Sequence, residues 1–227
     1  MPDPTYEPLT WDNEGERLFE TGIEKGVLFV YDSTTKTYGN GVAWNGLTNV
    51  SEKPSGAEPT ALYADNIKYL NLISNEEFAA TVEAFTAPPE FAACDGTEEV
   101  APGVFIGQQK RKKFAFSYVT KVGNDTEGSD YGYKVHIIYG CTAQPTEKGY
   151  ATINDSPEAP TLSWEVSTNP VKVAGKKPTA CVTIDSTVVN DDTKMAALNA
   201  KLYGSTTAPA ALPTIEWLIS TFGTGNG

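Results

Sequence analysis

FAFSYVTKVGNDTEGSDYGYKVHIIYGC, residues 114 to 141, is the stretch of sequence that decides the fold. In each half of it, apolar or aromatic residues recur at alternate positions, which is the period of a β-strand. The residues that share one face are Phe114, Phe116, Tyr118 and Val122 in the first half, and Tyr133, Val135, Ile137 and Tyr139 in the second. Between the halves lies GNDTEGSDYG, residues 123 to 132. The pattern predicts an antiparallel hairpin stabilised by cross-strand aromatic and β-branched pairs.

The acidic, glycine-rich loop of this hairpin raises the question of a calcium site. An EF-hand loop needs a bidentate glutamate at its twelfth position. Counting from Asn124 places Val135 there, and counting from Asp125 places His136, so the motif fails. A looser cluster of loop carboxylates remains open, but a solvated turn relieved by asparagine and glycine is the commoner outcome.

Further short strands are expected on both sides of this hairpin. They are predicted at 26 to 31, 62 to 73, 149 to 153, 161 to 168 and 180 to 187, with hairpin punctuation at 37 to 50 and a polar loop at 51 to 60. Short strands separated by turns that contain proline or glycine favour a β-sandwich or β-barrel of antiparallel strands. The expected fold class is therefore mainly β.

Helical signals are concentrated near the C-terminus. Asp191 or Asp192 is placed to cap a flanking α-helix that ends at Gly204, with Met195, Leu198 and Leu202 on its buried side. A second short helical or irregular segment is expected at 213 to 222. PPEFAACDG, residues 88 to 96, predicts a turn or one helical turn. Residues 75 to 86 fit either a helix or a strand, and propensity alone favours a helix.

The length of 227 residues and the 40% hydrophobic content favour a single domain. Residues 1 to 24, with isolated apolar Trp11, Leu18 and Phe19, predict an extended N-terminal arm; 25 to 222 form the domain, and 223 to 227 a flexible tail. No apolar run long enough for a membrane span occurs, and the N-terminus lacks the basic and apolar regions of a signal peptide. We expect a soluble protein made in the cytoplasm, with no membrane partner.

A net charge of −12 disfavours binding to phosphate backbones or anionic lipid. The only basic run, Lys110 to Lys113, is short and precedes a predicted strand, where it is interpreted as a solvated edge that discourages unwanted pairing. The three cysteines, Cys94, Cys141 and Cys181, are widely spaced, which disfavours both a disulfide framework and a zinc site.

No catalytic signature is present in the sequence. GxSxG, GxGxxG and GxxxxGK[ST] are all missing, and His136, the only histidine, lies mid-strand, where a packed or surface role is expected. We therefore predict neither an enzyme nor a cofactor or metal site. Paired carboxylates stay open, since 29 acidic residues allow many pairs.

Several stretches together resemble the major tail protein of long-tailed bacteriophages, the subunit of the tail tube. They are LYADNIKYLNLIS (62 to 74), EEFAATVEAFTAPPEFAACDG (76 to 96), APGVFIGQQKRKKFAFSYVTKVGNDTEGSDYGYKVHIIYGC (101 to 141), YATINDSPEAPTLSWEVSTNPV (150 to 171) and DTKMAALNAKLYG (192 to 204). The resemblance covers most of residues 40 to 220 and rests on the combination of segments, because none is a catalytic signature.

The resemblance implies a β-sandwich or β-barrel tail tube domain that assembles as rings, usually hexameric, stacked into a hollow tube in the virion tail. Assembly in the host bacterial cytoplasm, contacts with a tape measure protein and with tail terminator or tip proteins, and passage of DNA through the lumen without specific binding are implied as well. An acidic lumen would repel DNA and so suit a conduit. The resemblance also favours a strand at 76 to 86.

In a tube of this kind, loops and arms join the subunits. The candidate interface residues are Trp11, Phe19, Tyr63, Asp65, Asn66, Asn124, Asp125, Glu127, Asp130 and Tyr131. The competing class is a carbohydrate-binding or adhesive β-sandwich that would use strand tyrosines as a platform, although such residues more often serve the core or an interface. An enzyme is the weakest alternative.

Overall fold

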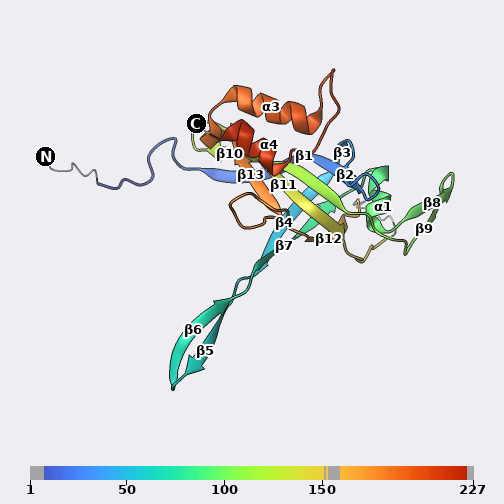
Figure 1. Cartoon of the computed structure of the whole chain (residues 1–227). Helices are drawn as coiled ribbons and strands as arrows, with labels where there is room; N and C mark the ends of the chain where they lie inside the picture. Colours follow the sequence, from blue (N-terminus) through green and yellow to red (C-terminus); the bar gives the residue numbers. More distant parts are fainter. Residues whose placement is uncertain (1–7, 151, 153–158, 224–227) are drawn as a thin grey trace.

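The computed structural model describes residues 8–150, 152 and 159–223. Within these residues the fold is mainly β, with one large antiparallel sheet, two separate hairpins and short helices, most of them towards the C-terminus (Figure 1). The expected fold class is confirmed. Every helix in the described part of the chain is too short or too polar to cross a lipid bilayer.

The large sheet contains nine strands among the described residues. They are β1 (Phe19–Asp32), β2 (Thr37–Tyr38), β3 (Val42–Trp44), β4 (Leu47–Gly56), β7 (Glu76–Ala84), β10 (Phe114–Asn124), β11 (Gly128–Ala143), β12 (Leu162–Thr168) and β13 (Cys181–Asp185). Their order is β2-β1-β10-β11-β12-β7-β4, with β3 also paired to β1 and β13 also paired to β11. The predicted hairpin at 114 to 141 is thus β10 and β11, at the centre of the sheet.

The sheet curls on itself like a partly closed barrel. The long strand β11 pairs with β13 along Lys134–Ile138 and with β12 along Cys141–Ala143, so two strands share one of its edges. The last strand of the order, β4, packs beside β1: a Cβ atom added at Gly26 in β1 would lie 2.6 Å from the Cδ1 atom of Leu47 in β4. The curled sheet therefore encloses one apolar core on its inner face and leaves an outer face to be covered.

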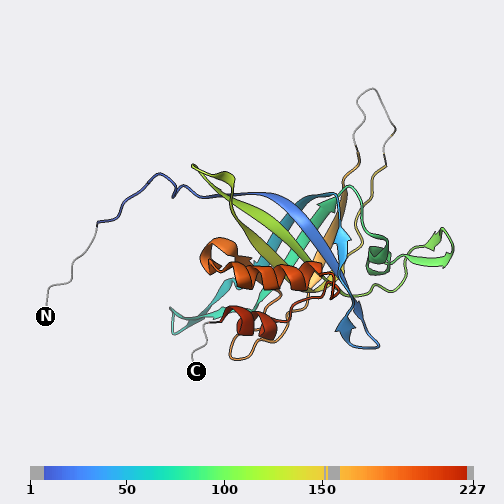
Figure 2. The same ribbon diagram turned by 90° about the horizontal axis from the view of Figure 1, so that it is seen from above.

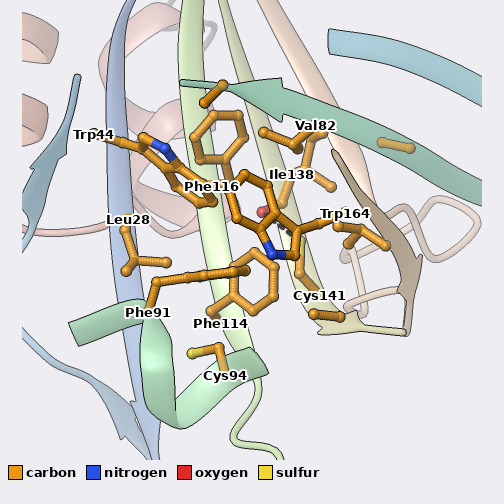
Figure 3. Close-up of a cluster of buried hydrophobic side chains, with 14 of the residues drawn as sticks. Leu28, Trp44, Val82, Phe91, Cys94, Phe114, Phe116, Ile138, Cys141 and Trp164 are labelled. Carbon is orange, nitrogen blue, oxygen red and sulfur yellow. Dashed lines mark hydrogen bonds between the residues drawn. The ribbon is translucent and has the colours of Figure 1, made fainter. Parts of the chain in front are cut away.

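The inner core is dominated by aromatic rings (Figure 3). Phe91 meets Phe114 edge to face at 5.4 Å, and Trp44 meets Trp164 at 5.4 Å with the ring planes 70° apart. Such pairs contribute about 0.5–1.5 kcal/mol each beyond the burial of their area. Phe91 belongs to the short helical segment η1 (Pro89–Phe91), which continues as α1 (Ala92–Asp95) and ends at the left-handed Gly96, as PPEFAACDG predicted.

The outer face of β10 and β11 is covered by helices, as Figure 2 shows from above. After α2 (Ser186–Val189), helix α3 (Asp192–Tyr203) packs Met195, Leu198 and Leu202 onto the sheet, and α4 (Ile215–Phe222) follows. The side chain of Asp191 caps α3 by accepting from the backbone N–H of Thr193 and Lys194. The predicted cap and buried positions are confirmed.

Several sequence expectations for residues 51 to 96 are corrected. The segment 51 to 60 is no loop, because β4 continues to Gly56 with Pro54 in its ladder, and proline is tolerated on an edge strand. Residues 62 to 73 are not one strand but most of a hairpin, β5 (Pro59–Ala64) and β6 (Ile67–Ile73). The helix favoured by propensity at 75 to 86 is wrong, since this segment is β7, as the resemblance implied.

Other departures lie near chain ends and loops. The strand β1 begins at Phe19, so the last six residues of the arm expected at 1 to 24 belong to this strand, and Phe19, Glu20, Thr21 and Glu24 pair with β10. A hairpin of β8 (Glu98–Ala101) and β9 (Val104–Ile106) was not predicted. The strand expected at 149 to 153 is not formed at 149, 150 and 152, while 151 and 153 lie outside the described residues, as does 224–227 of the expected C-terminal tail.

Candidate assembly surfaces

The β5–β6 hairpin projects far from the body of the molecule (Figure 1). Its two-residue turn is Asp65–Asn66, with φ values of 52° and 63°, the conformation of a type I′ turn. All seven of its large apolar side chains are exposed, including Tyr63 at 73% and Tyr69 at 68%. The others are Leu62, Ile67, Leu70, Leu72 and Ile73.

These apolar side chains lie on both faces of the β5–β6 hairpin. Leu62 stands opposite Leu70, and Leu72 is on the same face, while Ile73, opposite Pro59, is on the other. A two-stranded hairpin is at best marginally stable alone in water. A strand pair that is apolar on both faces and forms its own sheet is typical of a segment that becomes buried between neighbouring molecules.

The β8–β9 hairpin is a second projecting element with exposed Val100, Val104, Phe105 and Ile106. Its turn contains Gly103 with a φ of 77°. Sequence reasoning missed this hairpin, although the Pro-Gly dipeptide between two apolar stretches was a usable signal.

The described part of the N-terminal arm, residues 8 to 18, is tied to the body at the turn between β10 and β11. The backbone N–H of Gly15 donates to Oδ1 of Asp125 at 3.0 Å, and Nη1 of Arg17 lies 3.4 Å from Oδ2 of the same carboxylate. The side-chain amide of Asn124 donates to the carbonyl of Gly15 at 3.2 Å. Upstream of these contacts Trp11 is 76% exposed, so it has no apolar cover from its own chain.

The turn is much tighter than the ten-residue loop expected at 123 to 132. The ladder of β10 and β11 reaches the pair Asn124 and Gly128, leaving three residues between them. The buried Asn124 carboxamide oxygen accepts from the backbone N–H groups of Thr126 and Glu127. Of the candidate residues here, Asn124 and Asp125 therefore organise the turn and the arm, whereas Glu127, Asp130 and Tyr131 face solvent.

The candidate residues fall into two groups. Tyr63, Asp65 and Asn66 lie together at the tip of the β5–β6 hairpin, while Trp11, Phe19 and the residues 124 to 131 gather around the arm and the β10–β11 turn. No group of three or more His, Cys, Asp or Glu side chains within the described ranges is arranged to hold a metal ion. All three cysteines are free.

A wide groove of about 1300 Å³ opens beside α1. Apolar side chains such as Tyr31, Phe105 and Leu162 line it, together with the basic run 110 to 113 that directly precedes β10. Lys36 and Lys148 also line this groove, and Lys148 forms an ion pair with Asp95. We call this surface the basic groove.

His136 belongs to a polar network at one end of the inner face. Its ring stacks on Tyr118 with centroids 4.6 Å apart, and its Nε2 atom lies 2.9 Å from the hydroxyl of Thr120. The Thr120 hydroxyl also donates to Glu20, and the Tyr118 hydroxyl donates to Glu52 at 2.8 Å. The network links β1, β4, β10 and β11, so His136 is a packed, half-buried histidine, as predicted.

The pKa directions in this network follow from burial and contacts. Burial lowers the pKa of His136, against the opposing effect of the Glu52 and Glu20 carboxylates. The hydrogen bond from Lys134, at 2.7 Å, lowers the pKa of Glu20. The charged side chains of this network therefore pair with one another across the strands of the sheet, which is typical of residues that stabilise a sheet.

The tyrosines do not form one exposed platform. Tyr118 and Tyr139 are buried, and the Tyr139 hydroxyl donates to the carbonyl of Pro213. Tyr63 and Tyr69 are on the β5–β6 hairpin, and Tyr131 is near the β10–β11 turn. The carbohydrate-binding alternative therefore has no single aromatic surface to support it among these residues.

Comparison of this chain with known proteins finds similarity among solved structures. No protein-family model matches it, and no curated protein matches it significantly. Among solved structures it is similar to a chain of the anti-feeding prophage (AFP) baseplate, a 6-fold symmetrised cryo-EM structure. The identity is 10% and the TM-score 0.37, over 78% of this chain and 97% of that one. A TM-score of this size carries no inference about fold or function.

Proposed function

We propose that this protein is a structural subunit that assembles with itself into stacked rings, forming the hollow tail tube of a bacteriophage or a related particle. The observation that carries the proposal is the β5–β6 hairpin, which exposes large apolar side chains on both faces. A protein that acted alone would leave this surface in water at a cost in solubility. Burial against a second copy removes that cost.

The wider surface supports several contacts per subunit. The β8–β9 hairpin and the N-terminal arm add exposed apolar side chains at places distant in sequence from the β5–β6 hairpin. A subunit in a stacked ring needs both lateral and axial contacts, and heterologous contacts of this kind close within a ring and stay open along the axis. Residues 25 to 222 would form the tube-building domain in this proposal.

The tube would serve as a conduit for DNA. The net charge of −12 favours a wall that repels the phosphate backbone, so that DNA passes without specific binding. Hexameric rings, a tape measure protein, terminator or tip proteins and a place in the virion tail follow from the sequence resemblance to major tail proteins. A structural rather than catalytic role is part of the same proposal.

Removing the β5–β6 hairpin tests the proposal directly. Residues 58 to 74 are replaced by Asn-Gly, which joins β4 to β7 by a tight turn of a type that favours hairpins. Because the replaced side chains are exposed, the variant should remain a folded monomer, as circular dichroism and thermal unfolding would report. Sedimentation velocity of the concentrated proteins should then show large assemblies for the wild type and none for the variant.

A matched control changes exposed apolar surface elsewhere. Val188→Thr alters an exposed side chain in α2 and should leave assembly unchanged. Assembly by the hairpin-deleted variant at the wild-type concentration would contradict the role of the hairpin. A wild-type chain that stays monomeric at every concentration would contradict self-assembly itself.

A further inference from the structure

The basic groove is an unusual concentration of positive charge in an acidic protein. Six of the 17 lysine and arginine residues line it, namely Lys36, Lys110, Arg111, Lys112, Lys113 and Lys148. Only Lys148 among these six forms an ion pair with another described residue. Four acidic residues also line the groove, Glu90, Asp95, Glu98 and Glu99, and Asp95 is the partner of Lys148. Six cations against four anions leave an excess of two positive charges beside apolar surface, which suits a segment that is both acidic and apolar.

Arg111 gives the groove a specific unsatisfied donor. Its Nε atom is buried and has no hydrogen-bond partner among the described residues. The guanidinium is held against Gly96, where an added Cβ would lie 3.1 Å from Cζ. A buried donor without a partner destabilises the protein, and a carboxylate is the partner that a guanidinium binds best.

The N-terminal arm has the complementary chemistry. Residues 1 to 18 contain five acidic residues, Asp3, Glu7, Asp12, Glu14 and Glu16, and one base, Arg17. Arg17 is already paired with Asp125. Leu9 and Trp11 are 78% and 76% exposed, so the arm also carries apolar side chains that lack cover.

The two surfaces lie at opposite ends of the molecule. The basic run ends at Lys113, immediately before β10, whereas the arm is fastened at Asn124, where β10 ends. An 11-residue strand places these ends roughly 33 Å apart. Figures 1 and 2 both show the described part of the arm leading away from the body, on the side opposite α1.

We propose that the acidic N-terminal arm of one copy docks in the basic groove of the next copy, joining subunits head to tail. The inference rests on the proposed self-assembly and names the partner of two of its surfaces. Trp11 and Leu9 cover the apolar lining of the groove, while Asp12, Glu14 and Glu16 meet its cations. Such a contact is heterologous, so it propagates from copy to copy. Because its charged rim is exposed, it weakens as salt is raised.

Two full-length variants each remove one half of the contact. The arm variant is Asp12→Asn, Glu14→Gln and Glu16→Gln, which removes the charges of the arm without making it complementary to an acidic groove; asparagine is chosen at position 12 because Asp12 has a φ of 58°. The groove variant reverses three exposed cations, Lys110→Glu, Lys112→Glu and Lys113→Glu. A matched control reverses the exposed Lys172, Lys176 and Lys177, which do not line the groove. The protein concentration needed for assembly should be about tenfold higher for the arm variant and for the groove variant than for the control.

Mixing the two variants gives the decisive result. The groove variant keeps an intact arm and the arm variant keeps an intact groove, so one contact forms and cannot propagate. At a concentration below that at which either variant assembles alone, an equimolar mixture in about 0.05 M salt should therefore give a discrete dimer by sedimentation velocity, lost at about 0.5 M salt. A mixture that contains only monomers would overturn the proposal, as would assembly of both variants at the control's concentration.

Two outcomes separate this contact from the function on which it rests. Tubes formed equally by the wild type and both variants would overturn the arm contact and leave self-assembly intact. A wild-type chain that stops at short head-to-tail oligomers, together with a dimer in the mixture, would support the contact and contradict the tube.

Discussion

Replacing Tyr69 by serine should weaken assembly strongly without weakening the monomer. Tyr69 is 68% exposed on the β5–β6 hairpin, and a tyrosine side chain offers about 200 Å² for burial, so roughly 140 Å² is available to a partner. At about 25 cal/mol per Å² this area is worth about 3.5 kcal/mol in the assembled state. The critical concentration should therefore rise roughly 300-fold, because 1.4 kcal/mol corresponds to a factor of about ten.

The assay is the protein concentration left in the supernatant after high-speed centrifugation of assembled material. The free energy of unfolding should change by less than about 0.5 kcal/mol, since exposed substitutions rarely do more. Tyr150→Ser is the matched control, because Tyr150 is 83% exposed but lies outside the hairpin. A critical concentration within threefold of the wild-type value, a difference of about 0.7 kcal/mol, would refute the reasoning.

Three further predictions concern the fold. Phe91→Ala empties a fully buried aromatic position and should lower the free energy of urea unfolding by about 3–5 kcal/mol; a loss below about 1 kcal/mol would show that the inner core does not depend on this ring. Gly140→Ala places a Cβ atom against the Asn169 carbonyl oxygen at a residue with a φ of 63°, so it should lower the melting temperature. The control Gly149→Ala, at a residue with open space around it, should leave the melting temperature unchanged. Equal effects of the two substitutions would contradict the backbone strain expected at position 140. Burial holds the pKa of His136 below its ordinary 6.5, so the stability that this residue contributes is complete above pH 6.5 and declines as the pH falls below that value. His136→Gln should therefore make the free energy of unfolding depend less on pH in this range. An unchanged dependence on pH would exclude the effect.

The sequence predicts the centre of the sheet well because two independent patterns agree there. Alternation and β propensity both favour strands on either side of the turn that follows Asn124. The same region hides one feature. Phe116 pairs with Ile138, so the apolar stripe of β10 faces the inner core while Ile137 and its stripe face the helices. Both strands are buried on both faces, which alternation within one strand does not reveal.

The β5–β6 hairpin is the part that the sequence concealed. Pro54 and the polar residues around it suggested a loop, yet an edge strand accommodates proline. Asp65 and Asn66 form the turn, although neither is the glycine that usually marks a type I′ hairpin. The surface that the β5–β6 hairpin contacts in a second copy cannot be predicted from local sequence pattern, because an interface between copies depends on residues distant in sequence.

Negative-stain electron microscopy of the purified protein, fresh and after concentration, tests the central claim most directly. Self-assembly predicts rings or hollow tubes of uniform width that become more abundant as the concentration rises. Particles of monomer size at every concentration, from a protein that circular dichroism reports as folded, would contradict it.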